Sequence, residues 1–214
     1  MANITIIGAG NMARGIGTRM ATGRHQLQFL ARTPEHATAL AEELAGQGAS
    51  VTAGAIDEQI TGDVVVLATP YEAAVEFAQS AGEGLNGKVV VEISNPVDWA
   101  SFDRLVTPDD SSAAEEVAKR VPPGVPVVKA FNTTFAGTLV KGEVAGQNLD
   151  VLIAGDDEGA KTTVADLVES GGLRPIDTGP LRRARQLEHL GFLHMALQDT
   201  LGTGYRSAVK LIAP

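Results

Sequence analysis

The sequence predicts an α/β fold built on a doubly wound, mainly parallel β-sheet, followed by a small C-terminal helical segment. Short apolar runs rich in valine and isoleucine alternate along the chain with amphipathic runs of helical length. This alternation is typical of a parallel sheet covered by helices on both faces. The runs expected to form its strands lie at about residues 3–7, 26–31, 50–53, 63–68, 88–93 and 125–131.

Helices are expected between these strands, at about residues 11–22, 34–46 and 71–81. A further helix is expected after the fifth strand, beyond an irregular stretch of chain. Ser112 and Glu115 have the spacing of a capping box at its start, and Pro122 follows its end.

The last part of the chain is expected to extend one edge of the sheet and then to become helical. Two strand-like runs bracket a helix, and the three segments lie at about 149–154, 158–170 and 173–177. Beyond Gly179 the chain is predicted to be helical to about Leu201 and to break at Gly202. We therefore expect one domain over 1–178 and a segment over 179–214 that packs over the sheet edge or against a second subunit.

The first strand leads directly into a glycine-rich turn. Gly8 allows the tight turn, Gly10 lets the backbone approach a phosphate, and Ala13 allows the next helix to pack closely on the strand. The free N–H groups at the start of that helix favour an anion. Strand, glycine turn and helix together predict a Rossmann-type dinucleotide site.

The end of the second strand, Ala31-Arg32-Thr33, is expected to lie beside the adenosine ribose. An NAD site would place a carboxylate there, and this segment has none. Arg32 offers a planar cationic group suited to phosphate, and Thr33 offers a hydroxyl. His36, one helical turn later, could add a donor or be a solvated helix residue. The segment predicts NADP(H) rather than NAD.

Composition narrows the class of protein. The chain has 214 residues, 44% hydrophobic content, no cysteine and a formal net charge of −9. Without cysteine it has no disulfide or thiolate chemistry, and we expect a cytoplasmic protein. We expect neither a membrane span nor a signal peptide, because the apolar runs are of strand length and the glycine turn begins at Gly8. The acidic charge argues against nucleic-acid binding and requires positive charge to be concentrated where NADP binds.

Small polar residues follow the fourth, fifth and sixth strands, at the edge where such sheets bind ligands. The three segments are Thr69-Pro70-Tyr71, Ser94-Asn95-Pro96 and Lys129 to Thr134. Their hydroxyls and amides could hold a nicotinamide and its ribose, although these residue types are also common in ordinary turns.

No catalytic acid or base and no metal site is predicted. The expected ligand edge has no histidine and no paired carboxylates. His189 and His194 are five residues apart on the last helix, which is out of step for a metal pair, and we expect packing or surface roles for both. Hydride transfer between two heterocyclic cofactors requires chiefly that the rings be stacked and water excluded.

Several strings in the chain resemble the NADP oxidoreductases that depend on coenzyme F420. They occur in family order, and the most specific is the string from Gly172 to Leu181. The strings are Gly8 to Met12, Ala31-Arg32, Leu67 to Tyr71, Ser111 to Glu115, Val128 to Thr133, Gly155 to Asp157 and Gly172 to Leu181. The resemblance implies a homodimer that exchanges hydride between NADP(H) and the deazaflavin F420. It also implies that the segment over 179–214 closes the cofactor cleft of an NADP-binding Rossmann domain over 1–178.

The resemblance also implies where the cofactor binds. Gly10, Asn11, Met12 and Arg32 are expected at the phosphates and ribose, with Pro70 and Asn132 near the nicotinamide. The full set of expected cofactor-binding residues is Gly8, Gly10, Asn11, Met12, Ala13, Ala31, Arg32, Thr33, His36, Thr69, Pro70, Tyr71, Asn95, Asn132 and Thr133.

The hydride acceptor is open at this point. Asn132 stands where archaeal members of the family tend to carry histidine, and the segment around it also resembles the cytosolic NADPH domain of six-transmembrane metalloreductases, which pass hydride to FAD. An NADPH-dependent flavin (FMN or FAD) or ferric reductase is therefore an alternative. So is a non-catalytic NADPH sensor. An imine reductase is disfavoured, because only the segment from Gly179 onward could form its dimerisation domain.

Three further features have two interpretations each. Arg182, Arg183 and Arg185 could attract the phosphate and glutamate tail of F420, or form a solvated helix start. Asp177 is expected to be a structural cap rather than an acid. Trp99 is expected to cover an edge rather than to stack on a cofactor.

Overall fold

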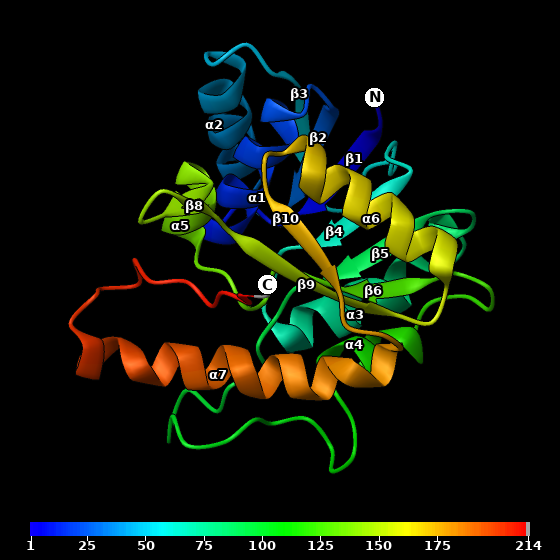
Figure 1. Ribbon diagram of the computed structural model, residues 1–214. Coiled ribbons are helices and arrows are strands. Elements are labelled where there is room, and N and C mark those ends of the chain that lie inside the picture. Colours follow the sequence, from blue (N-terminus) through cyan, green and yellow to red (C-terminus); the bar gives the residue numbers. More distant parts are fainter. Residues whose placement is uncertain (213–214) are drawn as a thin grey trace.

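The computed structural model describes residues 1–212, which form an eight-stranded sheet with helices on both faces (Figure 1). The strand order is β10-β9-β6-β5-β4-β1-β2-β3. These strands are β1 (Asn3–Ile7), β2 (Gln26–Ala31), β3 (Ser50–Ala55), β4 (Val64–Leu67), β5 (Val89–Glu92), β6 (Val127–Lys129), β9 (Asp150–Gly155) and β10 (Arg174–Asp177). The helices are α1 (Asn11–Thr22), α2 (Pro34–Ala45), α3 (Tyr71–Ala81), α4 (Ala113–Ala118), α5 (Ala136–Lys141), α6 (Glu158–Ser170) and α7 (Ala184–Leu201), with 3-10 turns over Gly82–Leu85 and Leu181–Arg183.

The topology confirms the predicted doubly wound fold. β1 pairs in parallel with both β2 and β4, so the chain crosses to the other half of the sheet between β3 and β4. That reversal opens a crevice at the carboxyl ends of β1 and β4, which is where open α/β sheets bind their ligands.

The two strands of the predicted edge extension run the other way. β9 pairs with β6 in antiparallel fashion, with Val128 opposite Gly155, and β10 lies parallel to β9. The carboxyl ends of β9 and β10 therefore lie on the side of the sheet where the central strands begin, away from the crevice.

Apolar side chains fill both sides of the sheet. All four residues of β4 are buried, as expected of a strand covered on both faces. α1, α2, α5 and α6 contribute to the core on one face, and α3, α4 and the start of α7 contribute to the other. Gly15 lets α1 approach α5, because a Cβ there would lie 2.8 Å from Leu139 Cβ.

Some predicted boundaries were wrong. β3 continues to Ala55, whereas β6 ends at Lys129 because Phe131 turns the chain with φ of +64°. The sequence analysis also missed α5, which at six residues is too short to show a period. It missed a hairpin as well, whose strands are β7 (Glu143–Val144) and β8 (Gln147–Asn148). Ala145 and Gly146 both have positive φ in its turn, as a type I′ turn requires.

The C-terminal segment packs on the same sheet. The start of α7 is buried against it through Ala184 and Leu187, and the helix ends at Gly202, which is left-handed at φ of +60°. Figure 1 shows α7 running along one side of the sheet before the chain turns back toward it. Lys210 then donates to Asp150 Oδ1, which ties this segment to β9.

None of the helices in the described part of the chain is both long enough and apolar enough to cross a membrane.

Candidate active site

Two adjoining cavities lie at the carboxyl ends of the central strands, with volumes of about 930 and 590 Å³. Gly10, Ala68, Thr69 and Pro70 line both. The first cavity extends from there past the end of β2, and the second extends past the ends of β5 and β6. One elongated ligand could occupy both.

The glycine turn has the geometry that the sequence predicts. Gly8 has φ of +110°, and a Cβ there would lie 2.5 Å from the carbonyl oxygen of Ala68. No atom lies within 4 Å of the Cβ position of Gly10, which is exposed at the shared part of the two cavities. A ligand can therefore approach the backbone at Gly10 without meeting a side chain.

The N-terminus of α1 is suited to an anion. Gly10 is its N-cap, no side chain caps it, and its first turn contains no acidic residue. The first N–H groups of the helix, with the positive end of its dipole, are available to a phosphate in the cavity.

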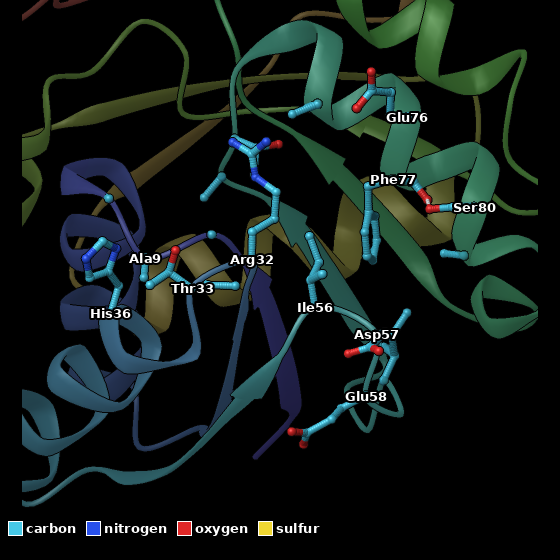
Figure 2. Close-up of a pocket in the computed structure, with 18 of the residues that line it drawn as sticks. Ala9, Arg32, Thr33, His36, Ile56, Asp57, Glu58, Glu76, Phe77 and Ser80 are labelled. Carbon is cyan, nitrogen blue, oxygen red and sulfur yellow. Dashed lines mark hydrogen bonds between the residues drawn. The ribbon is translucent and has the colours of Figure 1, made fainter.

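Arg32, Thr33 and His36 all line the first cavity, as predicted. Figure 2 shows Arg32 extending from the end of β2 into the space bounded by Ile56 and Phe77. The first cavity therefore combines a cationic group with apolar walls, as a nucleotide with a phosphate on its ribose would require.

The expected concentration of positive charge is not found. Carboxylates at Asp57, Glu58 and Glu76 line the same cavity as the basic residues Arg32 and Lys88. Lys88 Nζ donates to the carbonyl of Gly62 at 2.6 Å, which holds it at the wall of the cavity. The attraction for an anion therefore comes from the α1 backbone, Arg32 and Lys88, and Figure 2 shows Asp57 and Glu58 far from the Arg32 guanidinium.

Three residues that line the second cavity carry side-chain polar atoms without partners in the described part of the chain. Thr69 Oγ1, Ser94 Oγ and Asn132 Oδ1 are buried and make no hydrogen bond within the described chain. Leaving such atoms unpaired costs about 1–3 kcal/mol each, so a ligand with matching donors and acceptors would gain from meeting them. A primary carboxamide carries two donors and one acceptor, which this set can satisfy.

Asn95 and Asn132 hold each other in place. Asn95 Nδ2 donates to the Asn132 carbonyl at 2.8 Å, and Asn132 Nδ2 donates to Asn95 Oδ1 at 2.9 Å and to the Leu187 carbonyl at 2.8 Å. Gly191 permits this arrangement, because a Cβ there would lie 2.6 Å from Asn95 Oδ1. α7 thus supports the amide pair from behind.

Apolar and aromatic residues form a further part of the wall of the second cavity. They include Met195 of α7, Phe135 just before α5 and Tyr205 after α7. The loop after β5 contributes Trp99 and Val106. The sequence analysis missed Phe135, Met195 and Tyr205, since nothing near them in the chain marks them as site residues. Trp99, which is expected to cover an edge, also lines this cavity.

Lys129 lies beneath the site and not at its edge, contrary to the sequence-based placement. Its side chain is fully buried, and Nζ donates to Glu92 Oε2 at 2.5 Å, to the Ser94 carbonyl at 2.5 Å and to Glu188 Oε1 at 2.8 Å. Burial raises the pKa of Glu188. Although burial opposes it, the two carboxylates hold the pKa of Lys129 above its ordinary value. The cluster fixes the backbone at Ser94, where the second cavity begins.

Two predicted site residues line neither cavity. Ala13 is buried in the core, where it allows α1 to pack closely, and Thr133 is buried behind the site. The other predicted residues are divided between the cavities. The first holds Gly8, Gly10, Ala31, Arg32, Thr33, His36, Thr69 and Pro70, and the second adds Asn11, Met12, Tyr71, Asn95 and Asn132.

The arginine cluster also lies away from both cavities. Arg185 forms two hydrogen bonds with Glu115, at 2.7 and 2.8 Å, while Arg182 and Arg183 are exposed. Arg182 and Arg183 follow Leu181, whose N–H donates to Asp156, the residue after the end of β9. This geometry does not support a role in binding a ligand tail at the site.

Two further expectations are confirmed. Asp177 is structural, because it accepts hydrogen bonds from Lys161 Nζ at 2.8 Å and from the Gly179 N–H at 2.7 Å. His194 packs against Phe135, with ring centroids 4.2 Å apart, whereas His189 is exposed.

Similar proteins identify the family. A family model described as NADP oxidoreductase, coenzyme F420-dependent, matches residues 3–96. The F420-dependent NADP reductase of Methanocaldococcus jannaschii is 37% identical over 152 residues, which cover 68% of this chain and 67% of that protein. This chain belongs to the family of F420-dependent NADP oxidoreductases.

Two other similarities bear on the family assignment. The metalloreductase STEAP3 of Rattus norvegicus is 31% identical over 185 residues, covering 86% of this chain, and the chain spans 35% of the rat protein. A crystal structure of a candidate F420-dependent NADP reductase from Arthrobacter sp. FB24 is 28% identical, with a TM-score of 0.86 over the whole of both chains. The family fold therefore extends over the full chain.

Proposed function

We propose that this protein exchanges a hydride between NADP(H) and the deazaflavin coenzyme F420. The observation that carries the proposal is the pair of joined cavities, one suited to a nucleotide and the other combining unpaired polar atoms with an aromatic wall. The family membership supports this reaction.

The first cavity would hold the adenosine and phosphates of NADP. The α1 N–H groups and the open backbone at Gly10 would meet the pyrophosphate. Arg32 would bind the 2′-phosphate, because no carboxylate stands at the end of β2 to repel it. Thr33 and His36 lie beside Arg32 on the same wall.

The second cavity would hold the nicotinamide and the acceptor ring. Bound NADPH supplies the hydride. Asn132 Oδ1 would accept from the carboxamide, and the Thr69 and Ser94 hydroxyls could donate to its oxygen. Phe135 and Met195 exclude water from this space. Reducing a deazaflavin with one hydride also takes up one proton, for which solvent at the cavity mouth suffices.

A flavin is the second candidate acceptor. Asn132, which donates to Asn95, favours a flavin acceptor because it lies in the segment that resembles the metalloreductase NADPH domain. The similarity to STEAP3 adds support. The test is NADPH oxidation by the purified protein with F420, FMN and FAD supplied separately, each repeated with NADH. Turnover with F420 and NADPH supports the first proposal, and turnover with FMN or FAD alone supports the second. Tight NADPH binding without turnover would favour a sensor.

We also propose that the protein is a homodimer that associates through α7. Leu193, Leu197 and Leu201 are exposed and four residues apart, so they form one row along the helix. Exposed apolar rows of this kind are typical of interfaces. Sedimentation should give twice the chain mass, and Leu197→Glu should reduce it to the chain mass.

A further inference from the structure

Trp99 combines two properties that are unusual together. Its side chain lines the second cavity, yet 69% of its surface is exposed. It lies in the loop that follows β5, three residues beyond Pro96, where the segment Ser94-Asn95-Pro96 ends. A large aromatic ring therefore stands at the cavity mouth with much of its surface uncovered.

The position of Trp99 is fixed although the ring is exposed. An isolated bridge between Val97 and Leu105 closes the loop. Asp98 accepts hydrogen bonds from the Ala100 N–H at 3.1 Å and from Arg104 Nε at 3.0 Å. These contacts make the loop a braced hairpin.

Aromatic contacts brace the ring itself. Trp99 packs against Phe102, with ring centroids 5.9 Å apart, and Phe102 packs edge-on against Phe192 of α7 at 5.5 Å. The ring is thus held from one side by a chain of contacts that ends on α7. This contact reduces the side-chain freedom that would be lost when a ligand meets the ring.

The second cavity has buried, unpaired polar atoms on one part of its wall and large exposed apolar side chains on another. Its unpaired polar atoms are buried ones, Thr69 Oγ1, Ser94 Oγ and Asn132 Oδ1. Its exposed members include the large apolar or aromatic side chains of Trp99, Val106 and Tyr205, beside the polar Asn11 and Glu72. A carboxamide-bearing ring suits the buried polar atoms, and a second, flat apolar ring suits the exposed wall.

We propose that Trp99 stacks on the ring of the hydride acceptor and so selects planar aromatic heterocycles as acceptors. This inference rests on the proposed function and goes beyond it by naming the residue that determines the acceptor class. Loss of the indole should weaken binding of the acceptor about tenfold, given the strength of aromatic pairs plus the lost apolar area.

The test measures the affinity of F420 and FMN by equilibrium dialysis in the presence of NADP⁺, for the wild type, Trp99→Ala and Trp99→Phe. Val140→Ala is the matched control, because Val140 is also an exposed apolar residue but lines neither cavity. Binding of NADP⁺ alone is measured for every variant. Trp99 is the sole tryptophan, so its fluorescence provides a second readout of acceptor binding to the wild type.

We expect Trp99→Ala to weaken the acceptor about tenfold, Trp99→Phe to retain part of that affinity, and NADP⁺ binding to be unchanged in both. Equal acceptor affinity in Trp99→Ala and Val140→Ala would overturn the inference while leaving the proposed function intact. A parallel loss of NADP⁺ binding in Trp99→Ala would overturn it too, as it would indicate a general structural effect. Failure of the wild type to bind either F420 or FMN while it binds NADP⁺ would instead overturn the proposed function.

Discussion

Lys129 Nζ lies 2.8 Å from Glu188 Oε1 in the interior, and this ion pair joins β6 to α7. The same ammonium group holds Glu92 and the Ser94 carbonyl. One buried side chain therefore connects the sheet, the C-terminal segment and the backbone of the second cavity.

Lys129→Met should destabilise the protein by about 3–5 kcal/mol, because it leaves two carboxylates buried without their cation. Urea unfolding measures the loss. Arg14→Ala is the control, since Arg14 pairs with Glu43 in a partly exposed site and should cost less than about 1 kcal/mol. Equal losses in the two variants would contradict a special role for the buried cluster.

Arg32→Asp should weaken NADPH binding by at least about 3 kcal/mol, because a charge-assisted contact is replaced by repulsion, while NADH is affected much less. Titration calorimetry with both nucleotides gives the difference. Arg182→Asp, which changes an exposed arginine outside both cavities, makes the same change in net charge. An unchanged NADPH affinity in Arg32→Asp would mean that the adenosine site lies elsewhere.

Gly191→Ala should lower turnover more than it lowers NADP⁺ affinity. The new methyl group would lie 2.6 Å from Asn95 Oδ1 and 2.9 Å from the Asn132 carbonyl, so the amide pair must move. Gly137→Ala is the matched helical control, because nothing lies within 4 Å of its Cβ position. Steady-state kinetics on both variants measure the difference. Equal turnover in the two variants would argue against this account.

The free energy of unfolding should fall as the pH drops below 6.5, in part because of His194. Burial lowers the pKa of His194 from its ordinary 6.5. The unfolded chain therefore takes up the proton at a higher pH than the folded chain, and stability is lost as the pH falls toward the lowered value. His194→Gln should unfold with a weaker pH dependence over this range, as measured in urea at several pH values. His189→Gln, at an exposed position, is the comparison, and an equal change in both variants would contradict the assignment.

Much of the fold was predictable, since it depends on local pattern. The β-branched runs indicated the positions of β1, β4 and β5, and the Gly8 turn indicated the switch to α1. The site was predictable where it follows strand ends, as at Arg32 and Asn132. Met195 and Tyr205 could not be found in this way, because α7 brings them to the cavity from far along the chain. The role of Lys129 was hidden for the same reason, as its partner Glu188 lies on α7.

The most direct test of the proposed hydride transfer uses NADPH deuterated at C4, with the two stereoisomers supplied separately together with F420. We predict that one isomer transfers its deuterium to reduced F420 and that the other transfers none, because the second cavity would hold the two rings with one face of the nicotinamide toward the acceptor. Reduced F420 without deuterium from either isomer, or no reduction while NADPH remains bound, would contradict direct transfer between the two cofactors.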